Sequence, residues 1–184
     1  MVARARGLEG RIRLAQASDV VALTRIHVAS WHATYGDLIA PHNLARIEPK
    51  RTLARFRRHF WPDDESMLHV LELERGRERG IVGYASSGST SELGMRGEVY
   101  ELYLDPKAQR RGYGGRLLSA ALWALAERGQ TPAHVWVLSD NHGARRFYEQ
   151  MRGREVAQST ARFGDQLLAK TAYAWVDYLP WPER

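Results

Sequence analysis

The sequence predicts one mixed α/β domain with a partly antiparallel sheet and flanking helices. Its length of 184 residues suits a single domain with a sizeable core. Strand-like and helix-like periodicities alternate in the middle of the chain, and strand-like segments pair as hairpins toward both ends. Apolar residues make up 44% and charged residues 26%, values typical of folded proteins. We expect a flexible tail over residues 1–10 and one domain over residues 11–180.

The first third of the domain is predicted to hold one strand and two helices. A strand is expected at 11–15, where Ile12 and Leu14 share one face. A helix follows from Asp19 to about Thr34, with its apolar residues at helical spacing. Pro41 is expected to end the loop after this helix. The second helix covers 50–60 and stops before Pro62.

The periodicity then changes from helical to alternating. A charged turn with Gly76 and Gly80 joins the first two strands of this region and predicts a hairpin. After it, a basic, glycine-rich loop leads into a strong helix that stops at Gly129. The expected strands are 67–74, 81–86, 99–104, 134–138, 155–159 and 167–176, and the expected helices are 114–128 and 141–151.

Composition excludes several classes of chemistry. The chain has no cysteine, so disulfides, thiolate metal sites and a cysteine nucleophile are excluded. Its seven histidines show no HxxxH or HExxH spacing, which gives no support for a metal site. The net charge of +6 suggests an anionic partner, although a codon preference explains the excess of arginine over lysine equally well.

No membrane or nucleic-acid partner is expected. The basic N-terminus leads into no apolar stretch of signal-peptide length, and the longest apolar run, 117–126, is about half of what a bilayer span requires. A cytoplasmic location is therefore predicted. The arginines of the helix at 50–60 lack the interleaved aromatic residues of an RNA-binding sheet, so a solvated helix face is the simpler interpretation.

The segment ELYLDPKAQRRGYGGRLL, residues 101–118, predicts an anion site. A buried strand leads into a loop in which Gly112, Gly114 and Gly115 allow close approach of a ligand, and the loop opens a helix. Unpaired N–H groups and the positive end of the helix dipole favour a pyrophosphate there. The segment matches neither the GxGxxG dinucleotide fingerprint nor the P-loop.

A second motif makes the interpretation of this loop more specific. QRRGYG matches the Q/R-x-x-G-x-G/A pattern of acetyl-coenzyme A loops, and NxxARxFYE, Asn141 to Glu149, begins 29 residues after Gly112. With both motifs the chain resembles the GNAT superfamily of N-acetyltransferases over residues 11–175. The resemblance implies a largely antiparallel central sheet of about seven strands and acetyl-coenzyme A (acetyl-CoA) as cofactor. Where many members carry Leu-Gly-Phe after the second motif, this chain has Met151-Arg152-Gly153.

The resemblance also implies which residues hold the cofactor. The backbone of Leu102, Tyr103 and Leu104 would pair with the pantetheine arm as an added strand. Asn141 would bond the pantetheine, and Arg145 would reach the nucleotide phosphates. The pyrophosphate loop would start at Gln109 and comprise Arg110, Arg111, Gly112, Tyr113, Gly114 and Gly115, with Arg116 adding positive charge.

Two catalytic roles follow from the resemblance. Tyr148 corresponds to the general acid that protonates the departing thiolate, and helical spacing places it on one stripe with Asn141 and Arg145 while Phe147 faces elsewhere. A buried core tyrosine is the alternative. Glu98 corresponds to the base that deprotonates the amine. Glu101 is the second candidate, and the two carboxylates point to opposite faces unless a bulge intervenes.

The acceptor side is less defined. The segment from His27 to Gly36 resembles the acceptor-side opening of small bacterial members, where Trp31 and Tyr35 could wall a pocket or belong to the core. The resemblance implies a primary amine as acceptor, either a small molecule or a peptide N-terminus. A homodimer stays open because many relatives are dimers. A non-catalytic acyl-CoA sensor, and less so a basic nucleic-acid-binding module, are the alternative functions.

Overall fold

The structure, a computed structural model, describes residues 10–60, 65–74 and 79–176 of the chain. Residues 1–9 of the expected tail over 1–10, the turn around Gly76 and residues 177–180 of the expected domain lie outside these residues. The helices are α1 (Val20–Tyr35), α2 (Pro41–Leu44), α3 (Pro49–His59), α4 (Tyr113–Glu127) and α5 (His142–Gln150). The strands are β1 (Arg11–Leu14), β2 (Met67–Leu73), β3 (Gly80–Ser89), β4 (Gly97–Leu104), β5 (Ala133–Leu138), β6 (Arg154–Phe163) and β7 (Gln166–Trp175).

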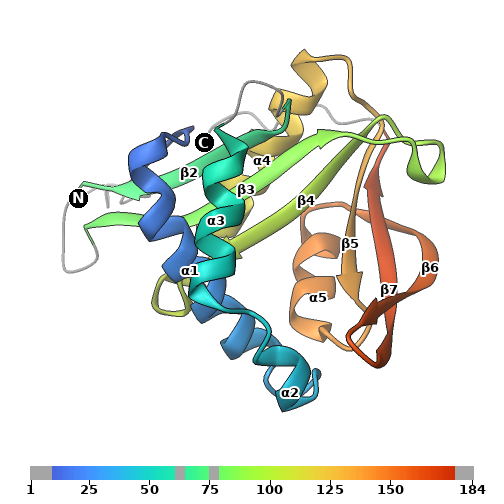
Figure 1. The fold of residues 1–184 in the computed structure, drawn as a ribbon. Helices are drawn as coiled ribbons and strands as arrows, with labels where there is room; N and C mark the ends of the chain where they lie inside the picture. Colours follow the sequence, from blue (N-terminus) through green and yellow to red (C-terminus); the bar gives the residue numbers. More distant parts are fainter. Residues whose placement is uncertain (1–9, 61–64, 75–78, 177–184) are drawn as a thin grey trace, which may run out of the picture.

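These strands form one seven-stranded sheet in the order β1-β2-β3-β4-β5-β7-β6. Every neighbouring pair is antiparallel except β4 and β5, which are parallel. The predicted α/β class and the largely antiparallel sheet are therefore confirmed. In Figure 1, α1 and α3 cover one face of β2–β4, α4 lies behind the same strands, and α5 lies beside β5.

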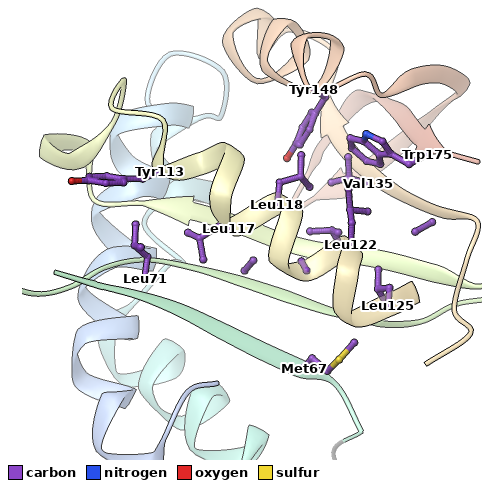
Figure 2. Close-up of a cluster of buried hydrophobic side chains, with 14 of the residues drawn as sticks. Met67, Leu71, Tyr113, Leu117, Leu118, Leu122, Leu125, Val135, Tyr148 and Trp175 are labelled. Carbon is purple, nitrogen blue, oxygen red and sulfur yellow. The ribbon is translucent and has the colours of Figure 1, made fainter. Parts of the chain in front are cut away.

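Two hydrophobic clusters bury the two faces of the sheet. The larger one lies under α4, whose inward side chains Leu117, Leu118 and Leu125 are fully buried, and Figure 2 shows them against β5 and β7. The smaller one packs α1 and α3 on β2 and β3 and includes Ile26 and Phe56. Helix α4 is thus held along its length, which fixes the position of the loop that precedes it.

Several elements differ from the sequence-based expectation. The loop ends at Pro41 as expected, but this residue also begins the short helix α2, which the sequence did not predict, and its fixed φ and missing N–H suit the first helical position. Strand β3 continues to Ser89, beyond the expected end at Ser86. Strand β6 continues to Phe163, beyond the expected end at Ser159, because it pairs with β7 along its whole length. Among the described residues, no helix combines the length and apolarity that crossing a membrane requires.

The hairpin of β6 and β7 packs against the region around α2. Asn43 donates to Asp165 Oδ1 at 2.6 Å and to Gln166 Oε1 at 3.1 Å, and Ala40 N–H donates to Gln166 Oε1 at 2.7 Å. Gly164, between the strands, has a φ of 62° and faces Asn43 so closely that a side chain there would collide with it. These contacts join segments more than 120 residues apart.

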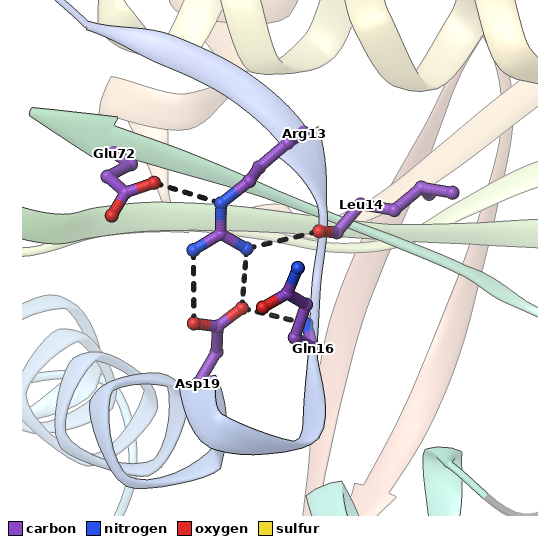
Figure 3. A network of polar contacts seen from close by, with 5 residues as sticks. All are labelled: Arg13, Leu14, Gln16, Asp19 and Glu72. Atoms are coloured by element: carbon purple, nitrogen blue, oxygen red, sulfur yellow. Dashed lines mark hydrogen bonds and ion pairs between the residues drawn. The ribbon is translucent and has the colours of Figure 1, made fainter.

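A charged network fixes β1 to the start of α1 (Figure 3). The Arg13 guanidinium donates to both oxygens of Asp19, at 2.7 and 3.1 Å, and to Glu72 at 2.9 Å. Burial alone would raise the pKa of Asp19, but the hydrogen bonds from Arg13 and from the Gln16 N–H outweigh it and lower that pKa. The ionised Asp19 therefore stabilises the fold.

Replacing Asp19 by asparagine is expected to lower the free energy of unfolding by about 2 kcal/mol at pH 7, because the partly buried Arg13 loses one of its two counter-charges. The folded pKa of Asp19 lies below the ordinary 3.8, so this stabilisation is present above that value and is lost as the pH falls through the folded pKa. Urea unfolding at pH 7 and pH 3 should show the difference shrinking at pH 3. Glu72→Gln, at a half-exposed partner, is the control and should cost less.

Candidate active site

The two central strands separate soon after they meet. β4 and β5 pair at only two positions, Gly97 with Ala133 and Glu98 with His134, and Figure 1 shows them diverging beyond this point. Among the described residues, the backbone of 102–104 therefore has no strand partner on the side of β5. This separation leaves a strand edge to which an extended ligand could add.

The loop before α4 has the backbone geometry of an anion site. Gly112 precedes the helix with φ 78° and ψ −5°, and Arg110 also has a positive φ of 63°. The first N–H groups of the helix have no intrahelical partner, and the dipole of this 15-residue helix is positive at that end. Gln109, Arg110 and Arg111 are exposed beside it. The loop thus places backbone donors and two arginines at one end of the separated strands.

Gly114 and Gly115 have a packing role. A Cβ on Gly114 would lie 3.4 Å from the Phe147 ring, and one on Gly115 would lie 3.3 Å from Met151 Sδ. These glycines let α5 approach the first turn of α4, whereas the sequence suggested that they admit a ligand. The side chain of Tyr113 is buried in the core, so only its backbone faces the loop.

Two of the arginines expected at the phosphates have partners inside the fold. Arg116 Nη2 donates to the Gly10 carbonyl at 2.7 Å. Arg145 donates to Tyr173 Oη at 3.1 Å and to Glu155 Oε2 at 3.3 Å. These bonds tie Arg145 to β6 and β7, and its role at the cofactor stays a prediction.

Helix α5 brings Asn141 and Tyr148 toward the separated strands. Asn141 Oδ1 accepts from Ala144 N–H at 3.1 Å and so caps the helix. Tyr148 is 6% exposed, and its ring centre lies 6.1 Å from that of Trp175 on β7 (Figure 2). Burial, and to a lesser extent the neighbouring Tyr35, raise the pKa of the Tyr148 phenol. The phenol therefore keeps its proton at neutral pH.

The end of α1 contacts the start of α5. The Tyr35 phenol interacts with the side chains of Tyr103 and Asn141. Trp31 lies one turn earlier, with its ring centre 4.8 Å from that of Tyr35 and 5.3 Å from that of Phe163 on β6. The expected contact between Trp31 and Tyr35 is therefore present, and these rings line the face of β4 opposite α4.

A bulge in β4 decides where the two candidate bases point. Val99 pairs with Ser87 and Glu101 with Ser86, so Tyr100 is an extra residue on β4. The bulge reverses the alternation of side chains between positions 98 and 101. As a result Glu98 and Glu101 both lie on the face away from α4, as the sequence allowed only if a bulge was present.

Glu101 is held by partners from two elements. Arg55 on α3 forms an ion pair with Glu101 Oε1, and the Tyr84 hydroxyl donates to Glu101 Oε2 at 3.0 Å. His27 Nδ1 lies 3.2 Å from Arg55 Nη2 and 2.7 Å from Tyr84 Oη. Burial, assisted by Arg55, lowers the pKa of His27 to about 4, so its ring is neutral at pH 7. Both carboxylate oxygens of Glu101 therefore have partners within the fold.

Glu98 has a different environment. Its Oε2 lies 3.9 Å from His134 Nε2, and its carboxylate interacts with Thr90. Burial first, and then the charge of Glu92, raise the pKa of Glu98 above the ordinary 4.5. Glu98 therefore binds a proton more readily than an exposed glutamate would, at the point where β4 and β5 begin to separate.

The model of the Acetyltransferase (GNAT) family matches residues 31–153, which include the loop, α4, α5 and both separated strands. The chain belongs to the GNAT family of acetyltransferases.

Individual GNAT relatives extend over most of the chain. YuaI of Bacillus subtilis (strain 168), an uncharacterized N-acetyltransferase, is 27% identical over 90% of this chain and 92% of its own length. The mycothiol acetyltransferase of Clavibacter sepedonicus is 41% identical over 97 residues, which are 53% of this chain and 30% of that protein. The structure of yncA from Salmonella typhimurium with its cofactor acetyl-CoA has a TM-score of 0.66 at 23% identity and covers 95% of this chain and 98% of its own.

Sequence reasoning missed part of this GNAT site. The motifs pointed to Glu98 and Glu101 but not to Arg55, Tyr84 and His134, which surround them. Arg55 was assigned to a solvated helix face, yet it reaches across to β4. These residues belong to no sequence motif. They come close to Glu98 and Glu101 only because the strands pair and α3 packs over the sheet.

Proposed function

We propose that this GNAT acyltransferase binds acetyl-CoA between β4, the loop before α4 and α5, and transfers the acetyl group directly to a primary amine. The observation that carries the proposal is the separation of β4 and β5, which begins at Glu98 and has the anion-binding loop at its other end. An extended cofactor with a phosphate at one end and a reactive group at the other matches this arrangement. No cysteine is present to carry an acyl intermediate.

The residues present fit such a cofactor. The backbone of 102–104 offers an unpaired strand edge to the amides of pantetheine. The left-handed Gly112 turns the chain so that backbone N–H groups at the start of α4 face outward, where a pyrophosphate would accept from them. Arg110 and Arg111 would add charge, and Asn141 would bond the pantetheine. Acetyl-CoA supplies an activated thioester at this site.

The protein's own groups move two protons. The Glu98 carboxylate accepts a proton from the acceptor ammonium, because the amine needs a free electron pair before it can attack. The phenol of Tyr148, kept protonated by burial, gives its proton to the departing sulfur. A backbone N–H of β4 polarises the reacting carbonyl. Solvent takes the second proton that the nitrogen loses as it becomes an amide, and it returns both side chains to their starting states.

The acceptor is an amine of a small molecule or the N-terminus of a peptide. Trp31, Tyr35 and Phe163 offer it an aromatic surface on the face of β4 that also carries Glu98. A panel of both acceptor types, incubated with the protein and acetyl-CoA, tests the proposal through thiol release and the mass of the product. Tight acetyl-CoA binding without acetylation of any member of the panel would favour a sensor over an enzyme.

Glu98→Gln is expected to lower kcat about 100-fold while leaving the Kd for acetyl-CoA unchanged, because only the proton acceptor is removed. Since the base acts as the carboxylate, kcat/KM of the wild type falls as the pH drops through a pKa above 4.5. This fall of kcat/KM at low pH, the acid limb of the profile, should vanish in the variant. Glu92→Gln, at the neighbouring carboxylate, is the control and should retain the limb. A Glu98→Gln enzyme with the wild-type pH profile would exclude Glu98 as base.

A further inference from the structure

His134 is a buried imidazole without a satisfied polar partner. Its side chain has 0% exposure, and neither ring nitrogen makes a hydrogen bond of good geometry within the described part of the chain. Its polar neighbours are the Glu98 carboxylate and the backbone of Gly97. Buried polar atoms in native proteins nearly always have partners, so this ring calls for a functional explanation.

The sheet fixes this ring opposite the proposed base. Glu98 and His134 are directly paired in the register of β4 and β5, at the last position before the two strands separate. The distance of 3.9 Å between Glu98 Oε2 and His134 Nε2 is too long for a direct hydrogen bond. One bridging water, or a small rotation of the carboxylate, would join them.

The charged groups around the pair offset one another. Glu92, between β3 and β4, and Lys170, on β7, influence both Glu98 and His134. Lys170 Nζ lies 3.8 Å from the centre of the Trp136 ring, and Trp136 Nε1 donates to Glu92 at 2.9 Å. Lys170 and Glu92 thus each contact Trp136. Glu98 and His134 face each other, and the ring of His134 packs edge-on to that of Trp136.

The proton affinities of Glu98 and His134 are closer to each other than those of an exposed glutamate and an exposed histidine. Burial raises the pKa of Glu98 and lowers the pKa of His134. A proton is therefore shared more evenly between this carboxylate and this imidazole than between an exposed glutamate and an exposed histidine.

We propose that His134 is a positioning residue that acts through Glu98 and shares the proton which Glu98 takes from the acceptor amine. In this step the ammonium N–H bond breaks, and its proton forms an O–H bond with Glu98 while the electron pair stays on nitrogen. The proton then passes through the bridging water to His134 Nε2, which restores the carboxylate and forms an imidazolium that later loses the proton to solvent. The inference rests on the proposed acetyl transfer, because it assigns a partner to the proposed base.

The interaction between Glu98 and His134 can be tested without measuring catalysis. The histidine C–H signals of the whole protein are followed by NMR from pH 4 to 9, and the signal absent from His134→Gln is assigned to His134. In Glu98→Gln, the titration midpoint of His134 should fall by about one pH unit, because the stabilising carboxylate is gone. Because the charge of Glu92 also raises the pKa of His134, Glu92→Gln is expected to lower the midpoint too, and it shows what loss of a neighbouring charge does when Glu98 is kept. An equal midpoint in wild type and Glu98→Gln would overturn the proposal even if no acceptor is ever found.

The catalytic consequence needs a second measurement. His134→Gln should lower kcat about tenfold and move the acid limb of kcat/KM, with the Kd for acetyl-CoA unchanged and circular dichroism confirming the fold. His134→Asn, a second neutral amide, should behave in the same way. A lower kcat with an unmoved acid limb would indicate a structural role and overturn the proposal. Failure of the wild type to acetylate any acceptor would instead overturn the proposed function and leave the NMR result to decide the pairing.

Discussion

Replacing Gly112 by aspartate should abolish acetyl-CoA binding at ordinary cofactor concentrations. Gly112 has the left-handed conformation that begins α4, at the point where we propose that backbone N–H groups hold the pyrophosphate. A carboxylate there adds bulk and places a negative charge against the phosphates. The combined cost is about 3 kcal/mol, or more than a hundredfold in Kd. Isothermal titration with acetyl-CoA measures it directly.

Gly112→Asn is the matched control for this variant. Asparagine has nearly the same shape as aspartate, tolerates a positive φ and carries no charge. It should weaken binding far less than aspartate, and the difference between the two variants isolates repulsion of the phosphates. Equal affinities for wild type, Gly112→Asn and Gly112→Asp would show that the phosphates bind elsewhere.

Tyr148→Phe should lower kcat about 100-fold and leave the Kd for acetyl-CoA nearly unchanged. Phenylalanine fills the same space against Trp175, so the packing survives and only the proton donor is lost. Because burial raises the pKa of the phenol, the wild type should keep its activity beyond pH 10, the ordinary value for tyrosine. Steady-state kinetics over a range of pH, with a binding measurement on the same samples, provide the test.

Tyr173→Phe is the control for the loss of a tyrosine hydroxyl. The ring centre of Tyr173 lies 5.9 Å from that of Tyr148, but its hydroxyl is bonded to Arg145 and Glu149. The change should reduce stability slightly and leave kcat close to that of the wild type. Full turnover in Tyr148→Phe would assign the acid to another group and return Tyr148 to the core.

Much of the fold could be predicted because local patterns and global packing agree. The seven strands and the three long helices α1, α3 and α4 follow from periodicity, since each buries the face that its apolar residues mark. The loop before α4 was identifiable because its glycines and its position between strand and helix depend on neighbouring residues alone. Helix α2 was missed because its four residues are too few to show a helical period, although Pro41 marked the end of the loop before it.

The arrangement of the catalytic candidates depended on information that no local pattern contains. The bulge at Tyr100 places Glu101 and Glu98 on one face, and it is visible only in the pairing of β3 with β4. The ion pair of Glu101 with Arg55 depends on how α3 crosses the sheet. The position of His134 beside Glu98 depends on a parallel register set by strands 36 residues apart.

The β6–β7 hairpin packs on α2, so two sets of segments surround β4 in different ways. The elements that we propose for the cofactor form one continuous stretch, whereas the opposite face of β4 is bordered by segments from both ends of the chain, joined through Asn43 and Phe163. The match to the family ends at Gly153, just before this hairpin begins. The turn of the hairpin, which meets Asn43, is therefore a place where a substitution would alter the border of that face without changing the stretch that we propose for the cofactor.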